Sequence, residues 1–219
     1  MDNREFLKRK IKAVFFDLDG TLLFSKETGH LTLDCLLRRH NREAFSDEIF
    51  QSFRGMPTRQ VLAYIDPEQV DSLLQEVIEI ENNFRDRSYL YPGILETLRT
   101  LDRAQIQLAV VTSRTTPEVE QVRAHFHLDD LIQVWISADD ILHPKPHPES
   151  IEKAMGIIQV AKEHTLFIGD THYDITAGKR SRVLSGAALW GRNDVKELLA
   201  HDPDYIFYHP VEIQELCLS

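Results

Sequence analysis

Apolar segments of strand length alternate with amphipathic helical segments along most of this chain. Strands are expected at residues 11–17, 106–113, 131–137, 165–170, 183–190 and 203–208. Helices are expected after the break at Pro92–Gly93 and at residues 116–128, 147–158, 173–181, 193–201 and 210–217. Strands that are joined through helices form βαβ units, in which the strands run parallel. The sequence therefore predicts an α/β fold with a parallel sheet sandwiched by helices.

One segment, residues 24–88, interrupts this alternation and is expected to be helical. Ser46 is placed to cap a short helix that ends near Gly55, and Asp66 followed by Pro67 is a typical helix start. Beyond that start, apolar residues follow helical spacing at Val70, Leu73, Leu74, Val77, Ile80 and Phe84. We therefore expect an α/β core formed by residues 1–22 and 89–219, with residues 23–88 inserted as a small helical bundle.

The composition limits the classes of partner. With 42% hydrophobic and 27% charged residues, the chain is expected to be a globular protein. Its net charge of −10 argues against nucleic-acid binding, which depends on Lys and Arg neutralising phosphates. Cys35 and Cys217 lack the spacing of a disulfide framework or a zinc site, which fits a cytoplasmic location. We found no apolar run long enough for a signal peptide or a membrane span.

Polar side chains follow three of the expected strands, at the point where each strand ends. Asp17 and Asp19 come directly after the first strand, Thr112 closes the strand at 106–113, and Asp170 closes the strand at 165–170. In open α/β sheets, ligands bind beyond the carboxyl ends of the strands. We therefore expect these four side chains to meet at a binding site.

Four motifs resemble those of the haloacid dehalogenase superfamily, and specifically of its phosphatases. They are Asp17-Leu18-Asp19-Gly20-Thr21 after an apolar strand, Thr112 closing AVVT, Lys145 in HPKPHPE, and GDTHYD with Asp170 and Asp174. Their order and approximate spacing match the family between residues 11 and 179. GDTHYDITAGKRS and ALWGRNDVKELLAHDPDYIF resemble the branch of phosphoglycolate phosphatases and related inorganic pyrophosphatases. This resemblance implies a Rossmann-like core with a small helical cap.

The same residues predict a chemistry. Asp17 is suited to attack a phosphoryl group and form an aspartyl-phosphate. Because nucleophile and substrate are both anionic, Mg²⁺ is expected as cofactor, held by the side chains of Asp17 and Asp170. The resemblance adds the backbone carbonyl of Asp19 as a metal ligand. Asp174 lies one helical turn after Asp170, and we expect it to hold a metal-bound water or orient a ligand.

Asp19 is expected to be the general acid and base. A carboxylate crowded by other carboxylates tends to have a raised pKa, which suits an acid, and we expect this of Asp19. The Thr112 hydroxyl and the Lys145 ammonium are suited to contact the phosphoryl oxygens and to stabilise the transition state.

Substrate choice is expected to depend on the helical segment. Its stretch SFRGMPTRQVL carries Arg54 and Arg59, and Arg114 follows Thr112, so these arginines are candidates for binding a second anionic group. The pair Ser113-Arg114 departs from the Asn-Lys that many phosphoglycolate phosphatases have. The leading hypothesis is a Mg²⁺-dependent phosphatase of a small anionic metabolite, phosphoglycolate-like or pyrophosphate. The alternatives are a phosphomutase of the β-phosphoglucomutase type and a catalytically weak phosphate-binding regulatory protein.

Several histidines stand near these motifs without a clear partner. His125 and His127 lie at an expected helix end without partner ligands, and we expect structural or surface roles for them. His143 and His147 flank Lys145, and we expect them to tune its loop rather than to bind a metal. His172 lies between Asp170 and Asp174, and the sequence assigns it no role.

Overall fold

A six-stranded parallel sheet forms the centre of the protein. The computed structural model describes residues 10–191 and 195–219. The strands lie in the order β5-β4-β1-β6-β7-β8, and all neighbouring pairs are parallel. Their bounds are β1 Ala13–Phe16, β4 Gln107–Val111, β5 Val134–Ile136, β6 Thr165–Gly169, β7 Leu184–Ala188 and β8 Tyr205–Phe207. The predicted α/β fold with a parallel sheet is confirmed.

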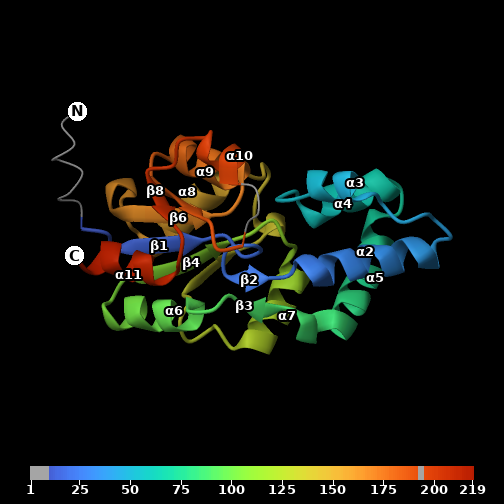
Figure 1. The fold of residues 1–219 in the computed structure, drawn as a ribbon, viewed down its shortest axis with the longest axis horizontal. Coiled ribbons are helices and arrows are strands. Elements are labelled where there is room, and N and C mark those ends of the chain that lie inside the picture. The colour runs from blue at the N-terminus through green and yellow to red at the C-terminus, as the bar shows by residue number, and fades with distance from the viewer. Residues whose placement is uncertain (1–9, 192–194) are drawn as a thin grey trace.

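Helices cover both faces of this sheet (Figure 1). Alternate residues of β1 point to opposite faces: Val14 and Phe16 join one apolar cluster, whereas Ala13 and Phe15 join another. The first cluster includes residues of α6 Ile94–Arg103, α7 Thr116–Phe126 and α11 Val211–Leu218. The second includes residues of α8 Glu149–Ile158 and α9 His172–Ser181. Strand β1 is buried on both faces, which explains its continuous apolar run.

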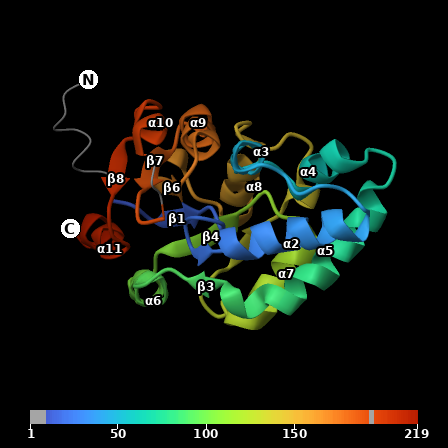
Figure 2. The same cartoon turned by 45° about the vertical axis from the view of Figure 1, so that its right-hand side comes forward.

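A helical insert extends from the carboxyl end of the sheet (Figure 2). We use this name for residues 26–87, which contain α2 Lys26–Arg39, α3 Asp47–Ser52, α4 Thr58–Ile65, α5 Val70–Phe84 and the 3₁₀-helix η1 Arg85–Arg87. The insert has an apolar core of its own, in which Leu36 and Leu37 of α2 pack with Leu62 of α4 and Leu73 of α5. The helices expected in this segment from the spacing of its apolar residues are therefore present.

The joint between insert and sheet contains two short strands that the sequence pattern did not indicate. Leu23–Phe24 (β2) pairs antiparallel with Tyr89–Leu90 (β3). Two residues per strand are too few for an alternating pattern to be recognised. This strand pair lies where the chain enters and leaves the insert, so the two chain connections between sheet and insert run side by side.

The predicted helix boundaries hold at Ser46 and fail at Pro67. The Ser46 hydroxyl accepts a hydrogen bond from the Ile49 amide and caps α3, as predicted. Asp66 instead ends α4, and its carboxylate accepts from the Glu68 amide in a turn, so α5 begins only at Val70. An Asp side chain favours turns as well as helix starts, and here the turn is the better competitor.

The remaining elements are short. They are α10 Val195–Leu199 and the 3₁₀-helices η2 Ala138–Asp140 and η3 Lys162–His164. The predicted helix at 193–201 thus lies partly outside the described residues. Within the described ranges, none of the helices is long and apolar enough to cross a bilayer.

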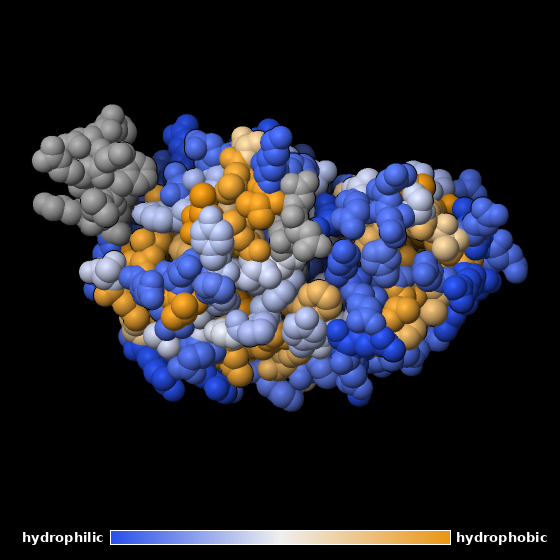
Figure 3. All heavy atoms as spheres, in the orientation of Figure 1, coloured by the Kyte–Doolittle hydropathy of each residue, from blue (hydrophilic) through white to orange (hydrophobic). Residues whose placement is uncertain are grey.

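The surface carries scattered hydrophobic side chains. On the face drawn in Figure 3, small hydrophobic areas lie among hydrophilic ones on both the sheet part and the insert. Ile206, Tyr208 and Val211, near β8 and α11, are among the exposed large hydrophobic residues. Scattered apolar residues of this kind are normal for a folded surface and call for no special role.

Candidate active site

Neighbouring strands bring the predicted residues to one edge of the sheet. The register pairs Phe16 of β1 with Val110 of β4 and with Ile168 of β6, so the residues that follow these strands lie close together. The Asp17 amide donates to the Ile168 carbonyl at 2.8 Å, which keeps the backbone of Asp17 in the ladder as its side chain enters the site. Parallel pairing therefore places the aspartate at a fixed position above the sheet.

Lys145 lies at the centre of this site. Its Nζ donates to Asp17 Oδ1 at 2.6 Å and to Asp174 Oδ1 at 2.7 Å, with a longer contact to the Val111 carbonyl at 3.3 Å. Burial disfavours the ammonium form, but the carboxylates of Asp17 and Asp174 outweigh burial and raise the pKa of Lys145. The lysine is therefore a fixed positive charge beside Asp17.

Asp174 is held by its own helix as well as by Lys145. Thr171 and Asp174 form a capping box at the start of α9: the Asp174 carboxylate accepts from the Thr171 amide at 3.0 Å, and the Thr171 hydroxyl accepts from the Asp174 amide. A carboxylate oxygen of Asp174 also lies within 4.8 Å of one of Asp170, so the two residues face the same site as expected. One oxygen of Asp174 holds the helix start and the other orients Lys145.

Three buried carboxylates form a candidate metal site. Asp17, Asp170 and Asp174 each offer a carboxylate oxygen, and these atoms all lie within 4.8 Å of one another. All three residues are buried, and Lys145 and Arg54 supply positive charge beside them. Hard divalent cations such as Mg²⁺ prefer oxygen donors of this kind. The donor set therefore fits the metal that the sequence predicts.

The two aspartates of the first motif have opposite pKa shifts. Burial raises the pKa of Asp17, and the neighbouring Asp174 and Asp170 add to this effect, whereas Lys145 opposes it. Burial acts on Asp19 in the same direction, but there Arg114 outweighs it and lowers the pKa. The expectation that Asp19 has a raised pKa is therefore wrong, because the charge nearest to it is a guanidinium rather than another carboxylate.

Arg114 binds Asp19 through two nitrogens. Nε donates to Asp19 Oδ2 at 2.7 Å and Nη2 donates to Oδ1 at 2.8 Å, while the Ser25 hydroxyl also donates to Oδ1. The third nitrogen, Nη1, donates to Glu81 on α5 at 2.7 Å. Arg114 is thus buried between two carboxylates, one in the sheet part and one in the helical insert. Sequence spacing marks Glu81 only as a polar position on α5, so its contact with Arg114 was not predicted.

Gly20 makes room for Asp170. Its φ is +84°, and a Cβ added there would lie 2.4 Å from Asp170 Oδ2. A side chain at this position would therefore meet both an unfavourable backbone conformation and a carboxylate of the site. The glycine of the DxDGT motif is required by this close approach.

The structure separates the three candidate arginines. Arg54 reaches from the insert, and its Nη2 donates to Asp170 Oδ2 at 2.8 Å. Arg59 pairs with Asp71 at 2.6 Å and with Asp139 at 3.2 Å, in an exposed position outside the lining of the site cavity. Arg54 and Arg114 therefore lie at the site, whereas Arg59 joins the insert to the sheet part.

A cavity of about 260 Å³ lies between the insert and the sheet edge. Asp17, Asp19, Thr112 and Asp170 line its floor. Apolar side chains from the insert and the first loop line much of its wall: Phe24, Leu33, Phe50, Phe53, Met56, Val61, Leu62 and Val77. Thr32 also lines it, and the Thr32 hydroxyl is buried without a hydrogen-bond partner. The sequence did not indicate this wall, because its residues come from β2, from the segment between α3 and α4, and from α2, α3, α4 and α5, which only packing brings together.

His172 lies away from the carboxylates despite its place in the motif. Its Nδ1 lies 3.2 Å from Glu197 of α10, and its ring stacks on His201. At the N-terminal end of α9, the His172 side chain thus points toward α10, whereas Asp174 points toward Lys145. His172 therefore serves as a contact between α9 and the region of α10.

Comparison with known proteins finds relatives over nearly the whole chain. Residues 14–188 match the model of the family described as haloacid dehalogenase-like hydrolase. A protein named pyrophosphatase PpaX from Anoxybacillus flavithermus is 32% identical over 200 residues, which cover 90% of this chain and 92% of that protein. A similarly named PpaX from Oceanobacillus iheyensis is 30% identical over 199 residues, covering 90% of this chain and 92% of its own.

Solved structures with a similar fold are also found. A putative phosphoglycolate phosphatase from Lactobacillus plantarum superimposes with a TM-score of 0.83 at 28% identity, covering 94% of this chain and 99% of that one. CbbY from Rhodobacter sphaeroides, solved with phosphate, superimposes with a TM-score of 0.82 at 19% identity, covering 93% and 96%. The second likeness concerns the fold alone.

Proposed function

Because the chain belongs to the haloacid dehalogenase-like hydrolase family, we propose that it is a Mg²⁺-dependent phosphatase of a small anionic metabolite. The observation that carries the proposal is the contact of Lys145 with both Asp17 and Asp174 at the sheet edge, beside Asp170. A buried cation among three carboxylates is a costly arrangement that the fold alone does not require. It suits a site that binds a phosphoryl group and a metal. The names of the relatives, pyrophosphatase and phosphoglycolate phosphatase, support the same reaction class.

In the first step, we assign Asp17 as the nucleophile. A carboxylate oxygen of Asp17 forms a bond to phosphorus, the bond from phosphorus to the leaving oxygen breaks, and a proton from Asp19 goes to that oxygen. Lys145 holds Asp17 in place and neutralises part of the charge that gathers on the phosphoryl oxygens. Thr112, which lines the cavity floor, is placed to donate its hydroxyl to the same oxygens.

In the second step, Asp19 acts as a base. It takes a proton from a water molecule that attacks the phosphorus of the aspartyl-phosphate, and the bond between phosphorus and Asp17 breaks to release phosphate. The lowered pKa of Asp19 suits this step, because the carboxylate is ionised while Arg114 holds it. Its acid role in the first step requires protonation, and therefore a weaker contact with Arg114.

Asp17 and Asp170 would hold Mg²⁺ through their side chains, and Asp19 through its backbone carbonyl. When bound, the ion supplies positive charge that reduces repulsion between the anionic nucleophile and the anionic substrate. Asp174 is placed to orient Lys145 and the ligands of this site, rather than to bind the phosphoryl group. The three buried carboxylates supply the hard oxygen donors that this ion prefers.

From the lining of the cavity, we infer an organic leaving group rather than inorganic phosphate. Its wall is largely apolar, and the buried Thr32 hydroxyl beside it has no hydrogen-bond partner. If pyrophosphate were the substrate, the leaving group would be phosphate, which is fully anionic and gains nothing from contact with an apolar wall. A leaving group with a carbon skeleton would be stabilised by that contact. Arg54, at the edge between insert and metal site, is suited to bind a carboxylate or a second charged group of the metabolite. We therefore propose a phosphate monoester of a small organic acid or alcohol as substrate.

Phosphate release across a panel of substrates tests this proposal. The panel comprises phosphoglycolate, pyrophosphate, sugar phosphates and nucleotides, each with Mg²⁺ and without any sugar bisphosphate. We expect release from at least one organic monoester at a higher kcat/KM than from pyrophosphate, and none from Asp17→Asn. Higher kcat/KM for pyrophosphate would contradict the substrate class. Turnover only with a sugar bisphosphate would indicate a phosphomutase, and no turnover at all would indicate a regulatory protein.

A further inference from the structure

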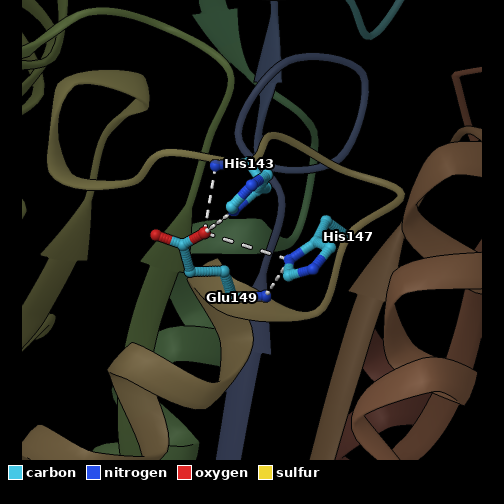
Figure 4. Close-up of side chains that lie close together, drawn as sticks. All are labelled: His143, His147 and Glu149. Carbon is cyan, nitrogen blue, oxygen red and sulfur yellow. Dashed lines mark hydrogen bonds and ion pairs between the residues drawn. The ribbon is translucent and has the colours of Figure 1, made fainter.

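His143, His147 and Glu149 form a cluster on the loop that carries Lys145 (Figure 4). Each residue offers one ligand atom, and these atoms lie within 4.8 Å of one another. Figure 4 shows both imidazole rings beside the Glu149 carboxylate. His143 Nδ1 lies 2.8 Å and His147 Nδ1 lies 3.9 Å from Glu149 Oε2. The ring centroids of the two histidines are 4.6 Å apart. The sequence suggested no metal here, because it did not show that Glu149 joins the pair.

The donor set of this cluster differs from that of the carboxylate site. Two imidazole nitrogens and one carboxylate oxygen are ligands typical of Zn²⁺ and related transition metals, which can leave a fourth position to water. The cluster of Asp17, Asp170 and Asp174 offers oxygen alone, which suits Mg²⁺. The two clusters should therefore select different ions.

Prolines hold the loop in the conformation that gathers these ligands. In HPKPHPE, the three prolines Pro144, Pro146 and Pro148 alternate with His143, Lys145, His147 and Glu149. Each proline fixes one backbone dihedral, so little conformational entropy is left to lose when a ligand binds. The Glu149 carboxylate also accepts from the amides of Leu142 at 2.8 Å and His143 at 3.0 Å, which closes the loop on itself.

The cluster is accessible from solution, whereas Lys145 in the same loop is buried. The side chains of His143 and His147 are 63% and 47% exposed, and that of Lys145 is 4% exposed. An ion can therefore reach the histidines without passing through the cavity above Asp17. Within one loop, the Lys145 side chain is therefore buried at the carboxylate site, whereas the side chains of His143 and His147 face the solvent.

We propose that His143, His147 and Glu149 bind one transition-metal ion, with Zn²⁺ as the probe, at a site separate from the carboxylate cluster. The bound ion joins the start of the loop to the first turn of α8, because His143 precedes Lys145 and Glu149 is the first residue of that helix. It stabilises the native protein, since the unfolded chain does not gather the three ligands. The site does not depend on the substrate proposed above.

Calorimetric titration with Zn²⁺ tests the site, on protein without a histidine tag and in saturating Mg²⁺. We expect the wild type to bind one more Zn²⁺ ion than the double variant His143→Ala/His147→Ala. The matched control is His125→Ala/His127→Ala, which removes two histidines near the end of α7 and should bind Zn²⁺ as the wild type does. Equal uptake by the wild type and the His143/His147 variant would overturn the proposal, as would an equal loss in the control.

Two further measurements separate metal binding from a merely structural cluster. Zn²⁺ should raise the melting temperature of the wild type and the control but not that of the His143/His147 variant. Glu149→Gln keeps one oxygen, which can accept from one of the two loop amides, but loses the charge and the second acceptor. It should weaken Zn²⁺ binding by at least about tenfold. Unchanged affinity in a folded Glu149→Gln variant would exclude the carboxylate as a ligand. If that variant does not fold, the histidine variants decide the question alone.

Discussion

Both carboxylate oxygens of Asp19 accept hydrogen bonds from the guanidinium of Arg114, at 2.7 Å and 2.8 Å. The same guanidinium binds Glu81 on α5 of the helical insert. A planar guanidinium that serves two carboxylates is a well-oriented bridge, because its five donors lie in a fixed plane. The position of the insert and the ionisation of Asp19 are therefore connected through one residue.

Removal of Arg114 should move the pH profile of the enzyme. Arg114 lowers the pKa of Asp19, so the base form persists to low pH in the wild type. In Arg114→Gln, burial would be opposed only by the Ser25 hydrogen bond and the charge of Lys145, so the pKa of Asp19 should rise. The acidic limb of phospho-enzyme hydrolysis should then shift to higher pH. Arg114→Lys keeps one positive charge and should shift the limb less. Rapid-quench measurement of hydrolysis against pH checks this, and an unmoved limb in Arg114→Gln would contradict it.

Asp17→Asn should stabilise the fold while it abolishes turnover. Burial raises the pKa of Asp17 in the folded state, so the ionised group lowers stability as pH rises from its unfolded pKa toward its folded pKa. Lys145 keeps its contact with Asp174 in the variant, so no buried cation is left alone. We expect a gain of about 1 kcal/mol at pH 7 without metal, as is common when a strained site is relaxed.

Thermal denaturation at two pH values distinguishes this cause from others. The gain from Asp17→Asn should be larger at pH 7 than at pH 4, because the penalty is present only where the wild-type carboxylate is ionised. Asp71→Asn is the control, since the Asp71 side chain is 90% exposed and its replacement should change stability little. An equal gain at both pH values would show that the charge of Asp17 is not the cause.

Lys145→Met should cost both activity and stability. It leaves the buried carboxylates of Asp17 and Asp174 without their shared cation, and the loss of one partner from a buried pair costs about 3–5 kcal/mol. Urea denaturation gives the free energy of unfolding for comparison. Lys153→Met is the matched control, because Lys153 pairs with Asp140 in a 39% exposed position and should change stability by less than about 0.5 kcal/mol. Similar losses in the two variants would contradict this account of Lys145.

The sequence was sufficient to predict the sheet and the residues on its edge. Each strand is an apolar run, and Asp17, Thr112 and Asp170 stand directly after such runs, so parallel pairing was enough to bring them together. Lys145 is different, because its loop belongs to no strand end. The expectation for Lys145 depended on the resemblance to a family, and the structure then placed its Nζ on Asp17.

Features that depend on packing between distant elements could not be predicted. The pKa of Asp19 is governed by Arg114, which lies 95 positions away in the chain, and no local pattern gives the orientation of a guanidinium. Arg54 and Arg59 lie in one short stretch, yet one faces Asp170 and the other faces Asp139. Arg54 lies between α3 and α4 and Arg59 lies on α4, so their partners follow from how these elements pack against the sheet part, which residue spacing alone does not give.

Gly20→Ala should lower the stability of the protein far more than Gly156→Ala, and it should also abolish activity. The added Cβ would lie 2.4 Å from Asp170 Oδ2, at a backbone φ of +84°. We expect loss of activity and a destabilisation of at least about 1 kcal/mol from the backbone conformation alone. Gly156→Ala is the control: nothing lies within 4 Å of its Cβ position on α8, and the change should stabilise the helix by about 0.5–1 kcal/mol. Unfolding free energies of opposite sign are the expected result.

Thr32→Val should change stability and substrate binding in opposite directions. The buried Thr32 hydroxyl has no hydrogen-bond partner, so its replacement by a methyl group of similar size removes an unpaired polar group that costs about 1–3 kcal/mol. The free protein should therefore become more stable. If the hydroxyl binds the leaving group in the cavity, the variant should also show a higher KM for the preferred organic monoester.

The two measurements on Thr32→Val together test the role of the cavity. Melting temperature without substrate reports the first effect, and steady-state kinetics report the second. Thr28→Val is the control, because Thr28 lies on the same helix but its hydroxyl already bonds to Ser88 at 2.7 Å, so its replacement should lower stability instead. A Thr32→Val enzyme with higher stability and an unchanged KM for every substrate would show that the hydroxyl is not used in binding, and the leaving group would then have to lie along the apolar wall alone.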